Sequence, residues 1–330
     1  MSKFLLYTDV HLRTFGSFPP YNILEPSGLT KEAHNFLKAR TFLIEKIKEL
    51  QPEKVIFLGD LFHNQEHLSL SELYLGYCFL QPILDVCNGI GAEHIGIPGN
   101  HDIANRNGTF NTLEPFHHYF HSVYTVPTIV DNMCFLPYSD DKESLDKFVK
   151  EHKPEFLFCH EEFHGAFMET GRPCSHPITY NQHAKKVFSG HLHLRQTVEN
   201  ITYPGSLIQH RFSNSNLDGI GGVLLYENGE ETHFINDKSS HYVVVKELED
   251  LEELKMSGIP FVAQIRTYES LETVKDICTS LEIDYQYINI PTKNSPDVYR
   301  DLPQFDPILM LRSWILRKRP DVVSLLDKFT

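Results

Sequence analysis

The chain has 330 residues, and its 41% hydrophobic and 22% charged residues are ordinary for a globular protein with a substantial core. Its formal net charge of −14 argues against a protein that grips nucleic acid over its whole surface, although it leaves room for a local basic path. The six cysteines form no C-x-x-C pair, which favours reduced thiols over disulfides or a thiolate zinc site. Because the sequence shows no signal-peptide pattern and no apolar run of bilayer length, we expect a cytoplasmic protein without membrane spans.

Three strands in the first hundred residues are each expected to end in polar side chains. The run 3–8 precedes Asp9 and His11, the run 55–58 precedes Asp60 and His63, and the run 93–98 precedes Asn100, His101 and Asp102. Helices over 30–50, capped by Thr30, and over 70–86 separate these strands, while residues 13–29 form a loop. This alternation predicts βαβ units and a buried, partly parallel sheet, which binds ligands at the carboxyl ends of its strands.

The middle of the chain continues the pattern. Loop and short helix are expected over 103–121, a strand over 133–137, a helix over 144–152, and a strand over 155–159 that ends at His160. Residues 161–178 are irregular and form a candidate lid or substrate loop, after which residues 186–188 lead into His191 and His193. The runs 197–203, 222–226 and 231–235 predict a meander that forms a second sheet packed on the first.

The C-terminal third predicts a small module followed by a tail. The polar segment 236–240 marks a boundary, and three strands over 242–246, 260–266 and 285–290 with a helix over 270–281 indicate a small α+β module. Prolines in 291–307 indicate a linker, after which Asp306 caps a helix. The predicted domains are therefore 1–237, 238–292 and 293–330.

The helix after the linker combines an apolar stripe with cations. Ile308, Leu311, Trp314 and Ile315 recur at helical spacing, and the cations Arg312, Arg317, Lys318 and Arg319 have no acid between them. One interpretation is a helix packed on its own domain. The other, which we favour, is a segment that docks its apolar face in the groove of a partner.

The polar strand ends have the composition of a two-metal hydrolase. Such a site holds two divalent ions roughly 3.5–4 Å apart through a bridging carboxylate and further nitrogen and oxygen ligands. Asp60 is the natural bridge; one ion would be held by Asp9, His11 and His193, and the other by Asn100, His160 and His191. These ligand types suit Mn, Fe or Zn. With two anionic ligands the centre would keep a charge of about +2, attract phosphate, and lower the pKa of a bridging water to give hydroxide.

Residues beside the ligands complete the expected chemistry. His101 is not needed as a ligand, so it can stabilise the developing charge and protonate the leaving oxygen, with Asp102 orienting it. The other histidines near the motifs are expected in loops or on the surface, not as ligands: His67, His164, His176, His183 and His210. The competing interpretation of the whole set is a group of hydrogen-bonded core histidines, against which five motifs in order argue.

This set of motifs resembles the calcineurin-like metallophosphoesterases. Asp9-x-His11, Gly59-Asp60, Gly99-Asn100-His101-Asp102, His160 and Gly190-His191-Leu192-His193 fill every metal-ligand position of that family in order. The resemblance implies an α/β fold with a two-sheet α/β/β/α core. Two further features are similar to the SbcD-type DNA-repair nucleases: Gly59-Asp60-Leu61-Phe62-His63 and Tyr203-Pro204-Gly205-Ser206-Leu207. The small module and the helical tail resemble the cap and the partner-binding segment of that branch.

The SbcD-type resemblance implies Mn²⁺-dependent hydrolysis of DNA phosphodiesters, as a 3'-5' exonuclease and endonuclease, with Mg²⁺ or Fe as other candidate metals. His63 would seat the scissile end and matter most for exonuclease action. The implied partners are DNA, a second copy of the chain, and an SMC-like ABC ATPase with a coiled coil, bound through residues 306–330. The chain is short for a cellular member, which suggests a compact viral version in a host cytoplasm. Four arginines flank the motifs, either as phosphate contacts or as solvated surface charges: Arg106, Arg172, Arg195 and Arg211.

Two other functions compete with this one. A phosphatase or a cyclic-nucleotide phosphodiesterase would use the same two-metal centre, but it would need neither a docking tail nor a DNA-sized cap. A non-enzymatic scaffold would be expected to have lost ligands, and none of the ligand positions is missing here.

Overall fold

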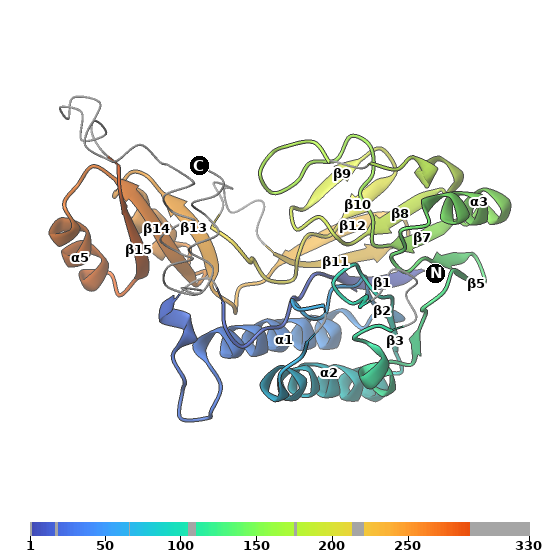
Figure 1. Ribbon diagram of the computed structural model, residues 1–330, viewed down its shortest axis with the longest axis horizontal. Coiled ribbons are helices and arrows are strands. Elements are labelled where there is room, and N and C mark those ends of the chain that lie inside the picture. Colours follow the sequence, from blue (N-terminus) through green and yellow to red (C-terminus); the bar gives the residue numbers. More distant parts are fainter. Residues whose placement is uncertain are drawn as a thin grey trace, which may run out of the picture.

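The structure is a computed structural model that describes residues 2–16, 19–65, 67–104, 110–174, 177–212 and 221–290. Two six-stranded sheets lie face to face, and a three-stranded sheet forms a small module beside them (Figure 1). Helices pack on the outer face of each large sheet, so the layers run helix, sheet, sheet, helix. The predicted α/β fold with a two-sheet core is confirmed, and both large sheets are mixed.

The first sheet has the strand order β12-β11-β1-β2-β3-β4. Strands β1 to β4 are parallel, whereas β11 pairs antiparallel with β1 and β12 pairs antiparallel with β11. Two long helices, α1 and α2, cover its outer face. The bounds are β1 Lys3–Tyr7, α1 Lys31–Leu50, β2 Lys54–Phe57, α2 Leu70–Ile90, β3 Glu93–Gly96, β4 Ser122–Val123, β11 Gly222–Glu227 and β12 Glu230–Ile235.

Strand β1 is buried on both faces, as the central strand of a layered fold must be. Phe4 and Leu6 point into the layer between the two sheets, whereas Leu5 and Tyr7 point to the helices, because side chains alternate along a strand. Thr30 caps α1 by accepting a hydrogen bond from the backbone N–H of Ala33, as predicted. The core thereby fixes the direction in which β1 delivers the residues that follow it.

The second sheet has the order β5-β6-β7-β8-β10-β9. The helix α3 and the segment that follows β7 pack on its outer face. The bounds are β5 Thr128–Val130, β6 Met133–Phe135, α3 Lys142–His152, β7 Phe156–Cys159, β8 Lys186–Ser189, β9 Gln196–Val198 and β10 Ile201–Tyr203. Short 3₁₀ helices span Pro19–Asn22, Glu114–Tyr119 and Tyr180–His183.

The predicted meander over 197–235 is wrong in two respects. The expected strand over 197–203 is a tight hairpin of β9 and β10, because Glu199 adopts a left-handed backbone with φ 52° and reverses the chain. Strands β11 and β12 do not continue that sheet. They join the first sheet, where Leu225 of β11 lies opposite Leu5 of β1.

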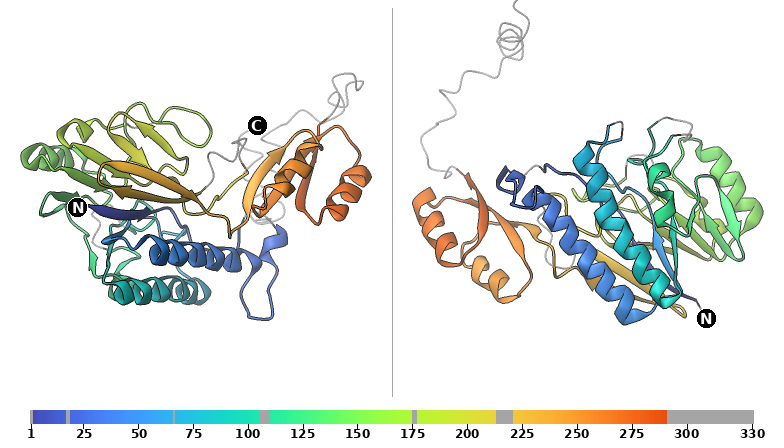
Figure 2. Two further views of the ribbon diagram at one scale, coloured as in Figure 1. Left: turned by 180° about the vertical axis from the view of Figure 1, so that it is seen from behind. Right: turned by 90° about the horizontal axis from the view of Figure 1, so that it is seen from below.

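The small module was predicted as α+β, but its strands alternate with helices and are all parallel, so it is an α/β unit. Its elements are β13 His241–Val245, α4 Asp250–Met256, β14 Phe261–Thr267, α5 Leu271–Ser280 and β15 Asp284–Asn289. Asn236 and Ser239 of the turn before it are buried, and the Asn236 side-chain oxygen accepts from the backbone N–H groups of Lys238 and Ser239. Asn35 of α1 pairs with the backbone of Ser240, which ties the module to the core (Figure 2).

Residues 291–330, with the predicted linker and docking helices, lie outside the described residues. Within the described part of the chain, no helix has the length and apolarity needed to cross a membrane.

Candidate metal centre

The five predicted motifs converge where the carboxyl ends of β1, β2 and β3 meet those of β7 and β8. Asp60 lies at the centre of this group. Its Oδ2 atom is 3.5 Å from Nε2 of His11 and 3.3 Å from Nε2 of His160. A single carboxylate oxygen thus faces one imidazole from each half of the predicted ligand set, which is the position of a bridge.

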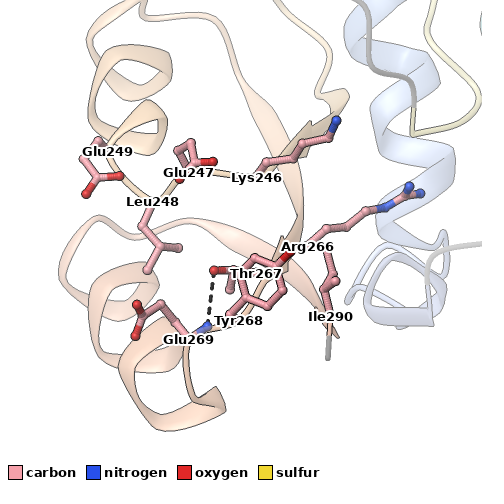
Figure 3. A pocket seen from close by; sticks show the side chains of 9 residues that line it. All are labelled: Lys246, Glu247, Leu248, Glu249, Arg266, Thr267, Tyr268, Glu269 and Ile290. Atoms are coloured by element: carbon pink, nitrogen blue, oxygen red, sulfur yellow. Dashed lines mark hydrogen bonds between the residues drawn. The ribbon is translucent and has the colours of Figure 1, made fainter. Parts of the chain in front are cut away.

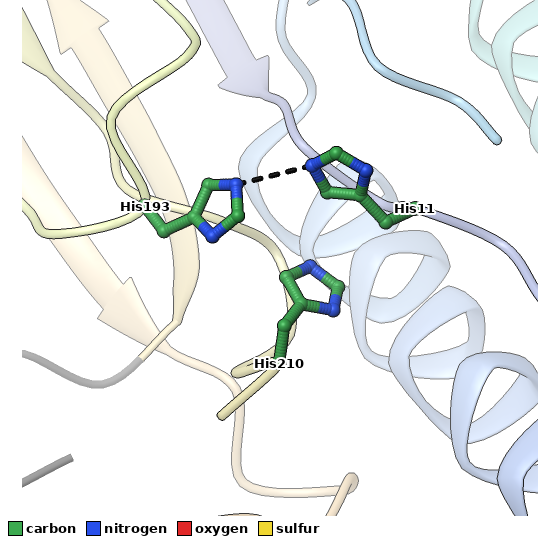
Figure 4. Close-up of side chains that lie close together, drawn as sticks. All are labelled: His11, His193 and His210. Atoms are coloured by element: carbon green, nitrogen blue, oxygen red, sulfur yellow. Dashed lines mark hydrogen bonds between the residues drawn. The ribbon is translucent and has the colours of Figure 1, made fainter. Parts of the chain in front are cut away.

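The ligands predicted for one ion surround the Asp9 carboxylate. Oδ1 of Asp9 is 3.8 Å from Nε2 of His11 and 3.6 Å from Nε2 of His193. The two imidazole nitrogens are 3.1 Å apart, and Figure 4 shows them facing one another. Three side chains from two sheets therefore point at one small volume.

The ligands predicted for the other ion gather around Asn100. Its Oδ1 atom is 3.1 Å from Nε2 of His160 and 2.8 Å from Nδ1 of His191. Nδ1 of His160 lies 2.6 Å from the Leu58 carbonyl, which fixes the ring with Nε2 toward the site. All seven predicted ligands are thus brought together in two adjoining groups that share Asp60.

The residues present fit a pair of divalent cations. Oδ1 of Asp9 is fully buried, and it has no hydrogen-bond partner among the residues that the structure describes. Burial lowers the pKa of His160, but Asp60 and Asp9 outweigh it and raise that pKa to about 10. Burial likewise opposes ionisation of Asp60, yet His160 lowers its pKa to about 2. The carboxylates thus favour positive charge between them, and nitrogen and oxygen donors of this kind suit Mn, Fe or Zn.

The backbone after the strands that carry the predicted ligands adopts strained conformations, which direct the ligand side chains into the site. Four predicted ligands that are not glycine adopt positive φ: Asp9 at 52°, His11 at 48°, Asp60 at 64° and His191 at 78°. Such residues cost of order 1–3 kcal/mol each and persist where the surroundings determine them. A Cβ on Gly99 would lie 2.7 Å from the backbone nitrogen of Asp60, so only glycine permits this close approach.

The predicted contact between Asp102 and His101 is corrected by the structure. The Asp102 carboxylate is fully buried, where it accepts from the Thr112 hydroxyl at 2.7 Å and from the backbone N–H groups of Gly99, Asp60 and Leu61 at 2.9, 2.6 and 3.0 Å. Nδ1 of His101 lies instead 2.7 Å from the carbonyl of His63. Asp102 therefore joins the loops after β2 and β3, and the His63 carbonyl orients His101.

His63 lies beside this histidine at the exposed side of the site. Its ring centroid is 5.6 Å from that of His101 and 5.6 Å from that of His11. Partial burial and the positive charge of Arg13 lower the pKa of His63 to about 4. The imidazole is therefore neutral near pH 7, which suits a hydrogen-bonding role and not that of a cation.

His210 was predicted as a loop or surface residue, and the structure places it in a loop but buries it. Its Nε2 lies 2.8 Å from the Asp9 carbonyl, and its ring centroid is 4.9 Å from that of His11 and 5.1 Å from that of His193 (Figure 4). Nδ1 lies 3.4 Å from the guanidinium of Arg13, which pairs with Glu32 at 2.7 Å. His210 therefore supports the backbone of a ligand in this arrangement, and its ring also lies close enough to His11 and His193 for the three to hold an ion.

Two acids that the sequence analysis missed touch predicted ligands. Glu162 lies 3.0 Å from Nε2 of His191, and Glu169 lies 3.1 Å from Nδ1 of His193. Both belong to the irregular segment after β7, where no periodicity or spacing distinguishes them. Their only sequence signal is that they follow His160 within nine residues.

The remaining candidates are distributed as follows. His67 and His164 are exposed, as predicted, whereas His183 is half-buried at the end of a 3₁₀ helix, and His176 lies outside the described residues. Arg172, Arg195 and Arg211 are exposed, and Arg106 is outside the described residues. The positive charge of Arg211 contributes to the lowered pKa of His63, so Arg211 lies close to the site.

A separate pocket of about 280 Å³ lies in the small module, beyond the carboxyl ends of its strands (Figure 3). Lys246, Arg266 and Tyr268 are among its lining residues, all of which fall between 246 and 290. It therefore contains none of the predicted metal ligands.

Comparisons with known proteins concern the part of the chain that carries the predicted metal ligands. A family model described as Calcineurin-like phosphoesterase matches residues 2–195, a range that includes every predicted ligand. The chain is 26% identical over 237 residues to "Putative phosphoesterase 244L" of Invertebrate iridescent virus 6, and the match covers 67% of this chain and 79% of the viral protein. Among solved structures, "GAP50 the anchor in the inner membrane complex of Plasmodium" is similar with a TM-score of 0.41 and 10% identity, covering 89% of this chain and 99% of that one.

Proposed function

This chain belongs to the calcineurin-like phosphoesterase family, whose members are metal-dependent hydrolases with a two-metal centre, and we propose that its substrate is DNA. The proposed activity is Mn²⁺-dependent cleavage of phosphodiester bonds, as a 3'-5' exonuclease and endonuclease of the SbcD type. The pair His63 and His101 carries this proposal. It supplies two neighbouring imidazoles on the open side of the centre, where the end of a nucleic acid strand can enter.

Different residues of the chain would have different roles in hydrolysis. When bound, the two ions would polarise the phosphate ester and lower the pKa of an attacking water. The backbone N–H of His101 donates to Oδ1 of Asp60 at 2.8 Å, which fixes this loop to the bridging carboxylate. Because the His63 carbonyl accepts from the Nδ1–H group of His101, Nε2 is the nitrogen that can pass a proton to the leaving oxygen, and it does so from the imidazolium form of the ring, which then becomes neutral.

Cations at the rim supply the proposed contacts to the DNA backbone. Arg172, Arg195 and Arg211 are exposed and lie on loops that carry or adjoin predicted ligands. Phosphate contacts of this kind hold the strand without reading its sequence. Arg106 belongs to the same proposal by its place in the sequence, six residues after the predicted ligand Asn100.

A substrate panel tests the function. Purified full-length protein with Mn²⁺ is expected to degrade duplex DNA and to stop when EDTA is added. Rapid turnover of a phosphomonoester or of a cyclic nucleotide, with none on DNA, would overturn the nuclease proposal in favour of a phosphatase or a cyclic-nucleotide phosphodiesterase.

The proposed partners are a second copy of this chain and an SMC-like ABC ATPase of the SbcC type, the latter bound through residues 306–330. The support for the ATPase is the apolar stripe and the cations of that segment in the sequence. Deleting 306–330 is expected to preserve basal metal-dependent hydrolysis and to abolish co-purification with the ATPase. Retained co-purification would refute the docking role.

A further inference from the structure

The two histidines of the 190–193 motif are each paired with a carboxylate from one segment, residues 161–174. Oε1 of Glu162 is 3.0 Å from Nε2 of His191, and Oε1 of Glu169 is 3.1 Å from Nδ1 of His193. The side chains of these four residues are between 17% and 25% exposed, so solvent screens the two pairs only in part.

One carboxylate contacts the Nδ1 atom of its imidazole and the other contacts Nε2. In each ring the contacted nitrogen is the one that faces away from the predicted metal site. His193 gives Nδ1 to Glu169, and its Nε2 faces Oδ1 of Asp9 at 3.6 Å. His191 gives Nε2 to Glu162, and its Nδ1 faces Oδ1 of Asn100 at 2.8 Å. A carboxylate accepts from an N–H, so each outward nitrogen carries a proton, and in the neutral ring this leaves the inward nitrogen to give its lone pair to a metal ion.

We infer that Glu162 and Glu169 are positioning residues that set the tautomer and the ring orientation of His191 and His193 for the two metal ions. Carboxylates behind ligating imidazoles raise the basicity of the ligand and fix its orientation. The inference rests on the two-metal centre of the proposed function, but it does not depend on DNA as the substrate. Residues 161–174, which lie within the segment 161–178 predicted as a lid or substrate loop, thereby become part of the metal centre.

The segment is held in place independently of the two pairs. The backbone of Phe167 exchanges two hydrogen bonds with the Gln196 side chain, at 2.8 and 2.7 Å, which fastens it to β9. The backbone N–H of Phe163 donates to the Tyr203 hydroxyl at 2.9 Å. Loss of one carboxylate should therefore leave the segment ordered, whereas loss of Gln196 loosens it with both carboxylates still present.

Two-site titration of the metal-free full chain with Mn²⁺ tests the inference. Glu169→Gln is expected to weaken the site formed by Asp9, His11 and His193 by about 10- to 100-fold and to leave the other nearly unchanged. Glu162→Gln should weaken the site of Asn100, His160 and His191 by a similar factor, and the double variant should weaken both. Each variant should unfold at the same temperature as the wild type in EDTA.

Two controls separate positioning from loop order. His164→Ala, an exposed change in the same segment, should keep Mn²⁺ affinity within about twofold of the wild type, because it preserves both carboxylate–imidazole pairs. Gln196→Ala loosens the segment that carries both carboxylates, so it should weaken the two sites together and not one site alone. Wild-type affinity in both glutamine variants would overturn the inference, and so would an equal loss at both sites in either single glutamine variant. If the wild-type protein is inactive on DNA while the glutamine variants show the site-selective loss of Mn²⁺ binding, only the nuclease proposal is refuted.

Discussion

The carbonyl oxygen of His63 and Nδ1 of His101 are 2.7 Å apart, and this contact joins the two histidines on the open side of the metal centre. The contact uses the backbone of one residue and the side chain of the other. The orientation of His101 is therefore independent of the His63 imidazole, so the two side chains can be tested separately.

His101→Gln is expected to lower kcat on DNA by about 10²- to 10⁴-fold, the usual contribution of a general acid. Metal binding should persist, because the variant retains the seven predicted ligands and the backbone N–H of residue 101, which donates to Asp60. Single-turnover rates at saturating Mn²⁺, with Mn²⁺ affinity measured in parallel, check this. Turnover near that of the wild type, or a parallel loss of metal, would remove His101 from the chemistry.

His63→Ala should separate exonuclease action from the chemistry of the centre. The variant keeps the carbonyl that orients His101, so hydrolysis of a small phosphodiester should continue at close to the wild-type rate. Release of nucleotides from DNA ends should fall at least tenfold, because the imidazole next to the entering strand is lost. His67→Ala, a change at an exposed histidine four residues on, is the control for both assays. Equal losses on both substrates would contradict a separate role in seating the DNA end.

The ligands could be predicted from the sequence because each follows an apolar run, and the carboxyl ends of neighbouring parallel strands converge. The roles of Glu162 and Glu169 could not be predicted, because they lie in irregular backbone, where no periodic pattern of residues indicates which way a side chain points. His210 was misjudged for the same reason: it follows Tyr203 through a loop, and only the tertiary fold brings that loop beneath Asp9. The antiparallel pairing of β11 with β1 joins residues more than two hundred positions apart, which local patterns do not encode.

Asp102→Ala should destabilise the fold more than it alters the chemistry. The carboxylate accepts from three buried backbone N–H groups and from Thr112, and each buried group left unpaired costs about 1–3 kcal/mol. We expect the free energy of unfolding to fall by at least about 3 kcal/mol, as measured with urea in EDTA. Asp102→Asn, which keeps one of the two acceptor oxygens, should lose less. A normal unfolding midpoint with disordered His101 would restore the original prediction that Asp102 orients that histidine.

Acid should destabilise the protein through three histidines away from the metal centre, of which His94 and His241 are buried and His233 is half-buried. Burial lowers the pKa of His94 to about 3 and those of His233 and His241 to about 4, against an ordinary value of 6.5. The folded state binds fewer protons than the unfolded state between these values. Stability is therefore full above about pH 6.5 and falls as the pH drops toward 4, by about 1.4 kcal/mol per pH unit for each histidine.

His94→Leu tests this dependence. The wild-type ring lies 2.8 Å from the Tyr7 hydroxyl and 2.9 Å from the Tyr119 carbonyl, so the variant should be less stable at pH 7. Between pH 6 and 4, however, its free energy of unfolding should fall less steeply with pH than that of the wild type. The difference in slope should correspond to about one proton, as measured by urea unfolding at several pH values. Replacement of the exposed His67 should leave the slope unchanged. A slope in His94→Leu equal to that of the wild type would show that His94 binds its proton in the folded state.

Arg13→Met should lower stability because it leaves a buried acid without its cation. Arg13 and Glu32 pair at 2.7 Å with side chains 9% and 3% exposed, and the Tyr242 hydroxyl of the small module donates to the same carboxylate at 3.0 Å. Removing one partner of such a pair costs about 3–5 kcal/mol, whereas replacing both with apolar residues costs much less. The double variant Arg13→Met/Glu32→Leu should therefore be more stable than Arg13→Met alone. Urea unfolding of both single variants and the double variant measures the coupling, and strictly additive losses would show that the pair contributes nothing as a pair.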